Sequence, residues 1–481
     1  MKRAAAQIGL IGAAAFVALT CATQVRPAQS RPAKPAAEAT LSVPVIFTAA
    51  PVYDSLAALR GGERFPRGAQ LMLLRNGHIA PLAPELAASA DASISFDGKT
   101  VLFAGKKNAR DAWQIWQLPL DGGHPQVVLA GKTDLIRPLW MPDGRMVYAR
   151  RDATGFALET AALDGSGPLK LSYVPGNFIP DDVLRDGRVL FDSGFPLGAG
   201  AKPEIYTVYA DGSGEEAVRC DHELAQRAGG RSHGRQMPSG DIVFTQAGRL
   251  ARFTSALAAE APIAAPPGDY AGDISALPDG RWLLSVRRSA ERHSELAVWK
   301  PPVPARFSGD PEARPASPAL ATVARSTQLD FIQPVLVEPR PVPNRHPSGL
   351  HAWTTGNLLA LDARLARSGE LAIAPTRVRV ETLSATGSVI VLGTAPVAPD
   401  GSFFVQAAAD QPLRFILLDA KNRVLRQEQG WFWIRRGEQR VCVGCHTGPE
   451  RAPDNRLPGI FQLSTIPANV TGLAHPAPGA Y

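Results

Sequence analysis

A short turn phrase recurs along the first 280 residues and constrains the fold more than any other feature. In this phrase Asp-Gly or Ser-Gly precedes an apolar strand pattern, with glycines at positions 98, 144, 187, 240 and 280. The spacings between these glycines are 46, 43, 53 and 40 residues. Each phrase supplies the positive φ that a two-residue hairpin turn requires. A period of about 40 to 50 residues is typical of one four-stranded blade of a β-propeller.

A second Asp-Gly turn lies inside three of the repeats, at residues 121–122, 164–165 and 211–212. Two hairpins per period are what a four-stranded blade needs. We therefore predict an all-β fold in which residues 43–300 form a propeller of six blades, within a range of five to seven. The Pro-Asp-Gly form of the phrase resembles the repeats of TolB-type propellers.

The composition changes after residue 300. Residues 301–345 begin with six prolines between positions 301 and 318, which predicts a linker or an extended strap. Residues 346–437 contain the period-two pattern of residues 377–381 and the apolar run of residues 389–392, and they predict a small antiparallel β domain. The strand pattern then stops, so residues 438–481 are expected to form an irregular segment.

The N-terminus predicts export from the cytoplasm. Two basic residues precede a short apolar, Ala-rich stretch at residues 8–20, which is typical of a signal peptide over residues 1–23. Residues 24–42, rich in Pro and Ala, predict a flexible linker. Cys21 is a candidate for an N-terminal lipid anchor, the alternative being ordinary cleavage one or two residues later. No later stretch predicts a transmembrane helix, so we expect a periplasmic protein.

The charge balance argues against a nucleic-acid partner. The formal net charge is +7, and the chain has no block of five or more Lys or Arg residues. Hydrophobic residues make up 45% and charged residues 20% of the chain, which excludes wholesale disorder.

One motif near the C-terminus carries specific chemistry. Cys442-Val443-Gly444-Cys445-His446 has the C-x-x-C-H pattern, in which two thiols bind the vinyl groups of a heme and the next residue offers its imidazole to the iron. A zinc site would need a second pair of ligands, and no second Cys pair exists. A thioredoxin-like dithiol would need a βαβ context. We therefore predict one covalent heme c, with His446 as the proximal iron ligand.

The chain before this motif resembles the hydrazine synthase alpha-subunit-related family. The resemblance rests on the runs at residues 392–403, Leu417-Leu418-Asp419 and Arg436-Gly437-Glu438, followed by the motif itself. It implies a propeller that precedes a small β-rich domain, with the heme packed between the two. Hydrazine synthase has several such motifs where this chain has one, and Glu450 stands where the synthase has an iron-associated Tyr. The resemblance therefore implies the architecture and the heme rather than the reaction.

The second axial ligand of the iron stays open. The five Met residues all lie at or before position 237, so none falls in the heme region. The candidate distal ligands are His475, His351 and His346, each of which has the alternative of being a surface residue in a turn. An iron with no distal ligand is the further alternative, and it would favour catalysis.

Several other residues are candidates for roles around the heme. Arginine matches the geometry of a carboxylate, so the candidate partners for the heme propionates are Arg435, Arg436 and Arg440, the alternative being a solvated charge run. Three adjacent aromatic residues would shield a heme face or fill the β-domain core: Trp431, Phe432 and Trp433. One hypothesis for Cys220, His222 and His233 is that they bind a metal or shape a distal heme pocket. The alternative is a buried cysteine near two histidines in loops.

The sequence leaves three functional hypotheses. The first is an exported monoheme c-type cytochrome that transfers electrons, with the propeller as scaffold and docking surface for a redox partner protein. The second is a heme-dependent oxidoreductase acting on a small substrate, such as a nitrogen compound, between propeller and heme. The third is a TolB-like protein-binding propeller.

Overall fold

The computed structural model describes residues 39–194, 202–219, 230–256, 258–303, 319–366, 369–428, 430–444 and 456–472. All of them belong to one compact unit that spans residues 37–481. Within these ranges, no helix has the length and apolarity needed to cross a membrane. The signal peptide and most of the N-terminal linker lie outside the described residues, as do these predicted site residues: Cys21, Cys220, His222, Cys445, His446, Glu450 and His475.

The all-β prediction is confirmed, and the first two sheets follow the predicted repeat. Besides the strands, this region contains the short 3-10 helix η1 (Ala58–Arg60). The first sheet has the order β25 (Asp330–Leu336), β1 (Val45–Ala50), β2 (Gln70–Arg75) and β3 (His78–Pro81). The second sheet has the order β4 (Ala88–Ile94), β5 (Thr100–Lys106), β6 (Gln114–Pro119) and β7 (Gln126–Leu129).

An eight-stranded sheet comes next and consists of two four-stranded groups, which a single parallel pair between Phe156 and Asn177 connects. The first group is β8 (Leu135–Trp140), β9 (Arg145–Asp152), β10 (Gly155–Ala162) and β11 (Leu169–Lys170). The second group is β12 (Asn177–Val183), β13 (Val189–Gly194), β14 (Glu204–Val208) and β15 (Glu216–Ala217).

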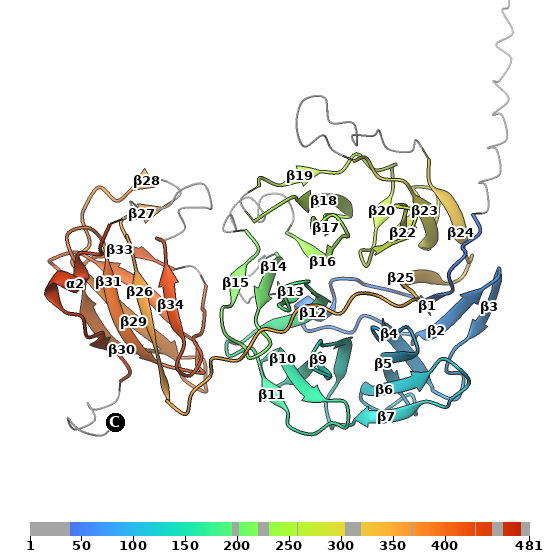
Figure 1. The fold of residues 1–481 in the computed structure, drawn as a ribbon, viewed down its shortest axis with the longest axis horizontal. Helices are drawn as coiled ribbons and strands as arrows, with labels where there is room; N and C mark the ends of the chain where they lie inside the picture. Colours follow the sequence, from blue (N-terminus) through green and yellow to red (C-terminus); the bar gives the residue numbers. More distant parts are fainter. Residues whose placement is uncertain are drawn as a thin grey trace, which may run out of the picture. The chain divides into compact units, whose positions relative to one another are not determined.

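Two further sheets complete the propeller (Figure 1). One has the order β16 (Ser232–Gln236), β17 (Ile242–Gln246), β18 (Arg249–Phe253) and β19 (Ala261–Pro262). In the other, β20 (Asp269–Tyr270) and β21 (Ser275–Ala276) both pair with β22 (Trp282–Arg287), and β23 (Glu295–Trp299) and β24 (Ala321–Ala324) follow. Among the described residues the propeller strands thus fall into six groups, whose first strands we call the inner strands: β25, β4, β8, β12, β16 and β20–β21.

The repeated glycines stand where the turn phrase predicts them. Gly98, Gly144, Gly187, Gly240 and Gly280 all have positive φ, and each lies between an inner strand and the next strand of its group. The sequence predicts these hairpins well because the Asp-Gly pair by itself favours the conformation of the turn.

The propeller closes with its last strand, and here the structure differs from the expected domain boundary. β24 and β25 lie inside residues 301–345, the range expected to be a linker or strap. β25 pairs with β1, so the end of the propeller and its beginning share one sheet. Pro334 lies within β25 and obscures the strand signal, although proline is tolerated there because β25 is an edge strand of its sheet. The extended segment that follows, residues 337–350, is here called the strap.

A β-sandwich follows the strap and confirms the small β-rich domain. One sheet has the order β34 (Gln439–Cys442), β26 (Thr355–Ala360), β31 (Phe403–Ala408) and β35 (Ala468–Asn469). The other has the order β30 (Val389–Pro396), β29 (Arg377–Leu383), β32 (Arg414–Leu418) and β33 (Val424–Gln427). A hairpin and a short helix accompany them: β27 (Leu365–Ala366), β28 (Gly369–Glu370) and α2 (Ile460–Leu463).

The sandwich differs from the prediction in one respect. β34 and β35 come from residues 438–481, expected to be irregular, and they pair in parallel with β26 and β31, whereas the other sandwich pairs are antiparallel. Both are short edge strands with few apolar residues, so the period-two pattern that signals a strand is too weak to detect in them.

A tryptophan of the sandwich region is buried in the propeller. Trp433 has no solvent exposure, and its indole N–H donates a hydrogen bond to the Gly212 carbonyl at 2.8 Å. Its ring lies 6.3 Å from that of Phe178 and 6.5 Å from that of Tyr173. Trp433 therefore belongs to the propeller core around β12, β13 and β14, and its neighbour Phe432 packs against the sandwich core.

Candidate functional site

The C-x-x-C-H motif begins where an edge strand of the sandwich ends. Cys442 is the last residue of β34, opposite Ala360 of β26, and its carbonyl accepts a hydrogen bond from the Leu361 N–H at 2.9 Å. The Cys442 side chain is half-buried against the sandwich core. Cys445 and His446 lie outside the described residues. The strand thus fixes the first predicted heme thiol on a rigid element.

The surface beside Cys442 is apolar and exposed. Val441 and Val443 are 58% and 46% exposed, and strand alternation turns them to the opposite face from Cys442. On that face Val441 lies beside Leu359, and Leu359 lies beside Phe404 on the next strand. These side chains therefore lie on the face away from the Cys442 thiol. Cys442 is half-buried at the end of its strand, so its thiol fits attachment to the edge of a heme, which stays a prediction.

The three candidate propionate partners already face carboxylates. Asp410 lies 3.0 Å from Arg435 and 2.7 Å from Arg436, and Arg440 lies 2.8 Å from Glu438. Arg435 is 2% exposed, with its guanidinium 4.5 Å from the ring centre of Tyr173 in the propeller. Burial and the positive charge of Arg436 lower the pKa of Arg435 to about 10. The role of these arginines toward propionates stays a prediction.

The described candidate histidines lie on different elements. His351 stacks on Trp353 at 4.9 Å and lies against Gly437, in the turn that precedes β34. His346 stacks at 3.8 Å on Tyr209 in the propeller. His351 therefore lies near the start of β34, whereas Cys442 ends that strand.

His233 belongs to a polar ring at the centre of the propeller, which the sequence did not reveal. Four inner strands carry a residue of positive φ at a bulge, Gln333, Asp91, Arg137 and His233, and Asp273, also of positive φ, lies between β20 and β21. On the sixth, β12, the bulge falls at Asp181. Three of the six positions hold Asp and the others hold Gln, Arg and His, so no single residue type marks the position along the sequence.

Arg137 connects this ring. Its guanidinium lies 3.1 Å from Asp181 and 2.8 Å from Asp273, and its backbone N–H donates to Asp91 at 3.1 Å. All four residues are buried. Although burial alone raises the pKa of Asp273, the Arg137 charge holds that pKa well below its usual range. Among the described residues no group of three or more His, Cys, Asp and Glu side chains is arranged to bind a metal ion, and this ring is an ion-pair network.

A second cluster missed by the sequence lies between the propeller and the sandwich. Glu438 accepts hydrogen bonds from the Gly214 N–H at 3.1 Å and from the Arg435 N–H at 2.7 Å. Burial raises the pKa of Glu215 to about 7 and that of Glu428 to about 7. The residues come from positions more than 200 apart in the chain, so no local pattern could have indicated their contact.

This cluster should make stability depend on pH. In the folded protein the pKa of Glu215 lies above its usual value of 4.5. Its contribution to the free energy of unfolding is therefore complete below about pH 4.5 and declines as the pH rises to about 7, because the buried carboxyl must then ionise. We expect Glu215→Gln to raise the free energy of unfolding at pH 8 by roughly 1–3 kcal/mol and to flatten this decline. Urea unfolding between pH 4.5 and 8 measures both, with Glu216→Gln at the exposed next residue as the matched control. An unchanged slope in Glu215→Gln would contradict the assignment.

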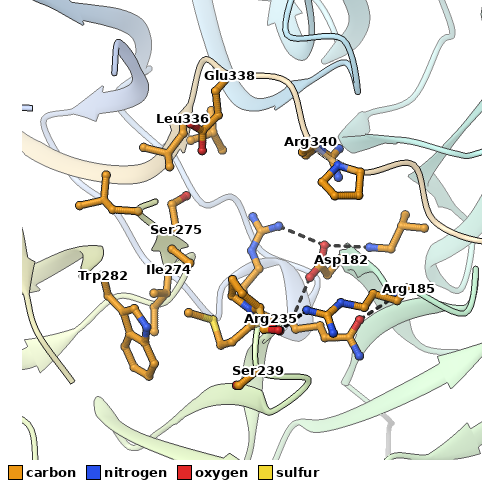
Figure 2. Close-up of a pocket in the computed structure, with 18 of the residues that line it drawn as sticks. Asp182, Arg185, Arg235, Ser239, Ile274, Ser275, Trp282, Leu336, Glu338 and Arg340 are labelled. Atoms are coloured by element: carbon orange, nitrogen blue, oxygen red, sulfur yellow. Dashed lines mark hydrogen bonds and ion pairs between the residues drawn. The ribbon is translucent and has the colours of Figure 1, made fainter. Parts of the chain in front are cut away.

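A cavity of about 970 Å³ opens at the end of the propeller that carries the Asp-Gly turns. The last residues of β4, β8, β12, β16, β21 and β25 line it, together with strap residues 338–344. Figure 2 shows Ile274, Trp282 and Leu336 on one side of the cavity, and Asp182 and Arg235 across from them. This cavity is the second candidate site.

The fold and the motif define a class of β-propeller protein in which a β-sandwich follows the propeller and bears a C-x-x-C-H segment. Residues 369–447 match the family model described as the hydrazine synthase alpha subunit middle domain. The resemblance to the hydrazine synthase alpha-subunit-related family is thereby confirmed.

Two solved structures are similar to this chain, and the first of them shares its fold. Hydrazine synthase from Kuenenia stuttgartiensis has a TM-score of 0.69 and 16% identity, over 86% of this chain and 70% of that chain. TolB from Acinetobacter baumannii has a TM-score of 0.41 and 14% identity, over 63% of this chain and 67% of that chain. A comparison with curated protein sequences finds no significant match.

Proposed function

We propose that this chain is the heme-carrying subunit of an exported redox enzyme that acts on a small substrate. One observation carries the proposal: the C-x-x-C-H motif lies at the end of the matched region, residues 369–447, and starts at the rigid end of β34. Cys442 and Cys445 would hold heme c through thioethers, and His446 would bind the iron from the proximal side. The heme would supply an iron centre that accepts and donates single electrons.

The chain's own residues would position this group. β34 fixes Cys442 at its C-terminal end, where the thiol would hold one edge of the porphyrin. The name of the similar synthase supports a nitrogen compound as substrate, and the word subunit in the name of the matching family model supports further subunits as partners. The signal-like N-terminus supports a periplasmic location, because c-type heme attachment occurs outside the cytoplasm.

Electron transfer by a monoheme cytochrome is the second candidate function. The single C-x-x-C-H motif favours it, since the chain has one such motif where hydrazine synthase has several. The similarity to an enzyme favours catalysis. The hypothesis of a propeller that only binds proteins has the least support, because such a protein would not need an intact C-x-x-C-H motif.

The absorption spectrum of the purified holoprotein separates these candidates. Catalysis needs an iron with an open or easily displaced distal ligand. We therefore expect a high-spin ferric spectrum and a shift of the ferrous Soret band on addition of CO. A low-spin spectrum that CO does not change would overturn the enzyme proposal and support electron transfer. A near-infrared His/Met band would show instead that a propeller methionine reaches the iron.

A further inference from the structure

The propeller cavity has arginines whose hydrogen-bonding capacity is only partly used. Arg235 lies 3.4 Å from Asp182 and 3.6 Å from Asp273, both long contacts, and its buried Nε has no hydrogen-bond partner among the described residues. Figure 2 shows its guanidinium turned toward the open middle of the cavity. A buried donor without an acceptor costs free energy that a bound anion would recover.

Arg340 adds a second guanidinium from the strap. It donates to the Ile94 carbonyl at 3.1 Å and lies 4.4 Å from the ring centre of Phe96, and no described carboxylate forms an ion pair with it. Burial lowers the pKa of Arg340, the nearby charge of Arg235 lowers it further, and the charge of Asp182 raises it. Guanidinium groups recognise carboxylates through paired hydrogen bonds, and this wall therefore suits an anion.

The charge of the lining limits the charge of that anion. Four arginines line the cavity, Arg185, Arg235, Arg252 and Arg340, against three acids, Asp182, Asp241 and Glu338. The difference of 4 − 3 = 1 matches a single negative charge. A phosphate ester carries more charge than this wall would neutralise.

The opposite wall and the size of the cavity define the rest of the ligand. Ile274, Trp282 and Leu336 offer an apolar and aromatic surface, and this surface would bury a hydrocarbon or aromatic group. A volume of about 970 Å³ falls within the range of small-molecule sites, about 300–1,000 Å³.

We propose that this cavity binds a small organic monocarboxylate with an apolar body, its carboxylate between Arg235 and Arg340 and its body against Trp282. The proposal concerns the propeller and the strap and does not depend on the heme. The strap would act as one wall of the site, which gives it a role beyond connecting two domains.

Isothermal titration of the full-length protein with 4-phenylbutyrate tests the site. We expect binding of one molecule per chain, with affinity at least tenfold lower for the neutral amide 4-phenylbutyramide and for acetate, which lacks the apolar body. Arg340→Gln should weaken 4-phenylbutyrate binding at least tenfold, and Arg235→Gln should do the same. Arg249→Gln, an exposed arginine on β18 outside the cavity, is the matched control.

Circular dichroism verifies that each variant remains folded. If Arg235→Gln does not fold, Arg340→Gln still tests the site, because Arg340 lies on the irregular strap and takes part in no sheet pairing. Equal affinity for the acid and its amide would overturn the proposal, as would unchanged affinity in Arg340→Gln. No measurable binding of 4-phenylbutyrate at millimolar concentration would also overturn it. Tighter binding of phenyl phosphate would replace the carboxylate with a phosphate ester and so overturn the class proposed here.

Discussion

Replacement of both Cys442 and Cys445 by alanine should abolish covalently attached heme. Thioether bonds survive denaturation, so wild-type protein from a host that matures c-type cytochromes should keep its heme stain on a denaturing gel. The double variant has no thiol to form either bond, and the expected stain falls to background. The loss should be complete because the chain offers no second C-x-x-C-H motif.

Two further variants sharpen this result. Val443→Ala lies between the two cysteines, where it keeps both thiols and the spacing, so the heme stain should stay at the wild-type level. Either single cysteine variant should leave one thioether and an altered spectrum. Heme stain that persists in the double variant would refute the interpretation of the motif, whatever the state of the iron.

Replacement of Arg137 by alanine should destabilise the propeller by about 3–5 kcal/mol. The change leaves the buried carboxylates of Asp181 and Asp273 without their shared cation and removes the charge that lowers the pKa of Asp273. Several inner strands meet at this residue, so its loss affects more than one group at once.

Urea unfolding followed by tryptophan fluorescence measures the effect. Arg281→Ala is the matched control, because Arg281 pairs at 2.7 Å with the exposed Asp279 in a hairpin and should contribute less than about 1 kcal/mol. A loss in Arg137→Ala no greater than in Arg281→Ala would show that the ring adds little to stability.

The sequence predicts the parts of the fold that depend on residues close together in the chain. The Asp-Gly pairs at Gly98 and Gly144 indicate hairpins because the residue pair itself favours the turn conformation. The C-x-x-C-H motif is equally local. The sequence did not predict β25 because Pro334 interrupts the strand pattern. The proline is tolerated because β25 is an edge strand of its sheet.

The parts that the sequence does not predict depend on long-range contacts. Arg137 meets Asp273 across 136 residues, and Trp433 meets Gly212 across 221. Trp433 was expected to shield the heme or fill the β domain, and it packs into the propeller instead. Nothing near these residues in the sequence indicates such distant partners. The sequence therefore predicts that Trp433 is buried but not where, and it predicts neither the burial nor the ion pairs of Arg137.

The pairing of β25 with β1 has a consequence for the order of assembly. A chain that emerges N-terminus first, from a ribosome or a translocation channel, cannot complete its ring until Leu336 has emerged. Until then β1 lacks one of its two neighbours. Cys442 emerges 442 − 336 = 106 residues later. The propeller can therefore be complete before Cys442 emerges, and the proposed heme attachment would act on a scaffold that is already closed.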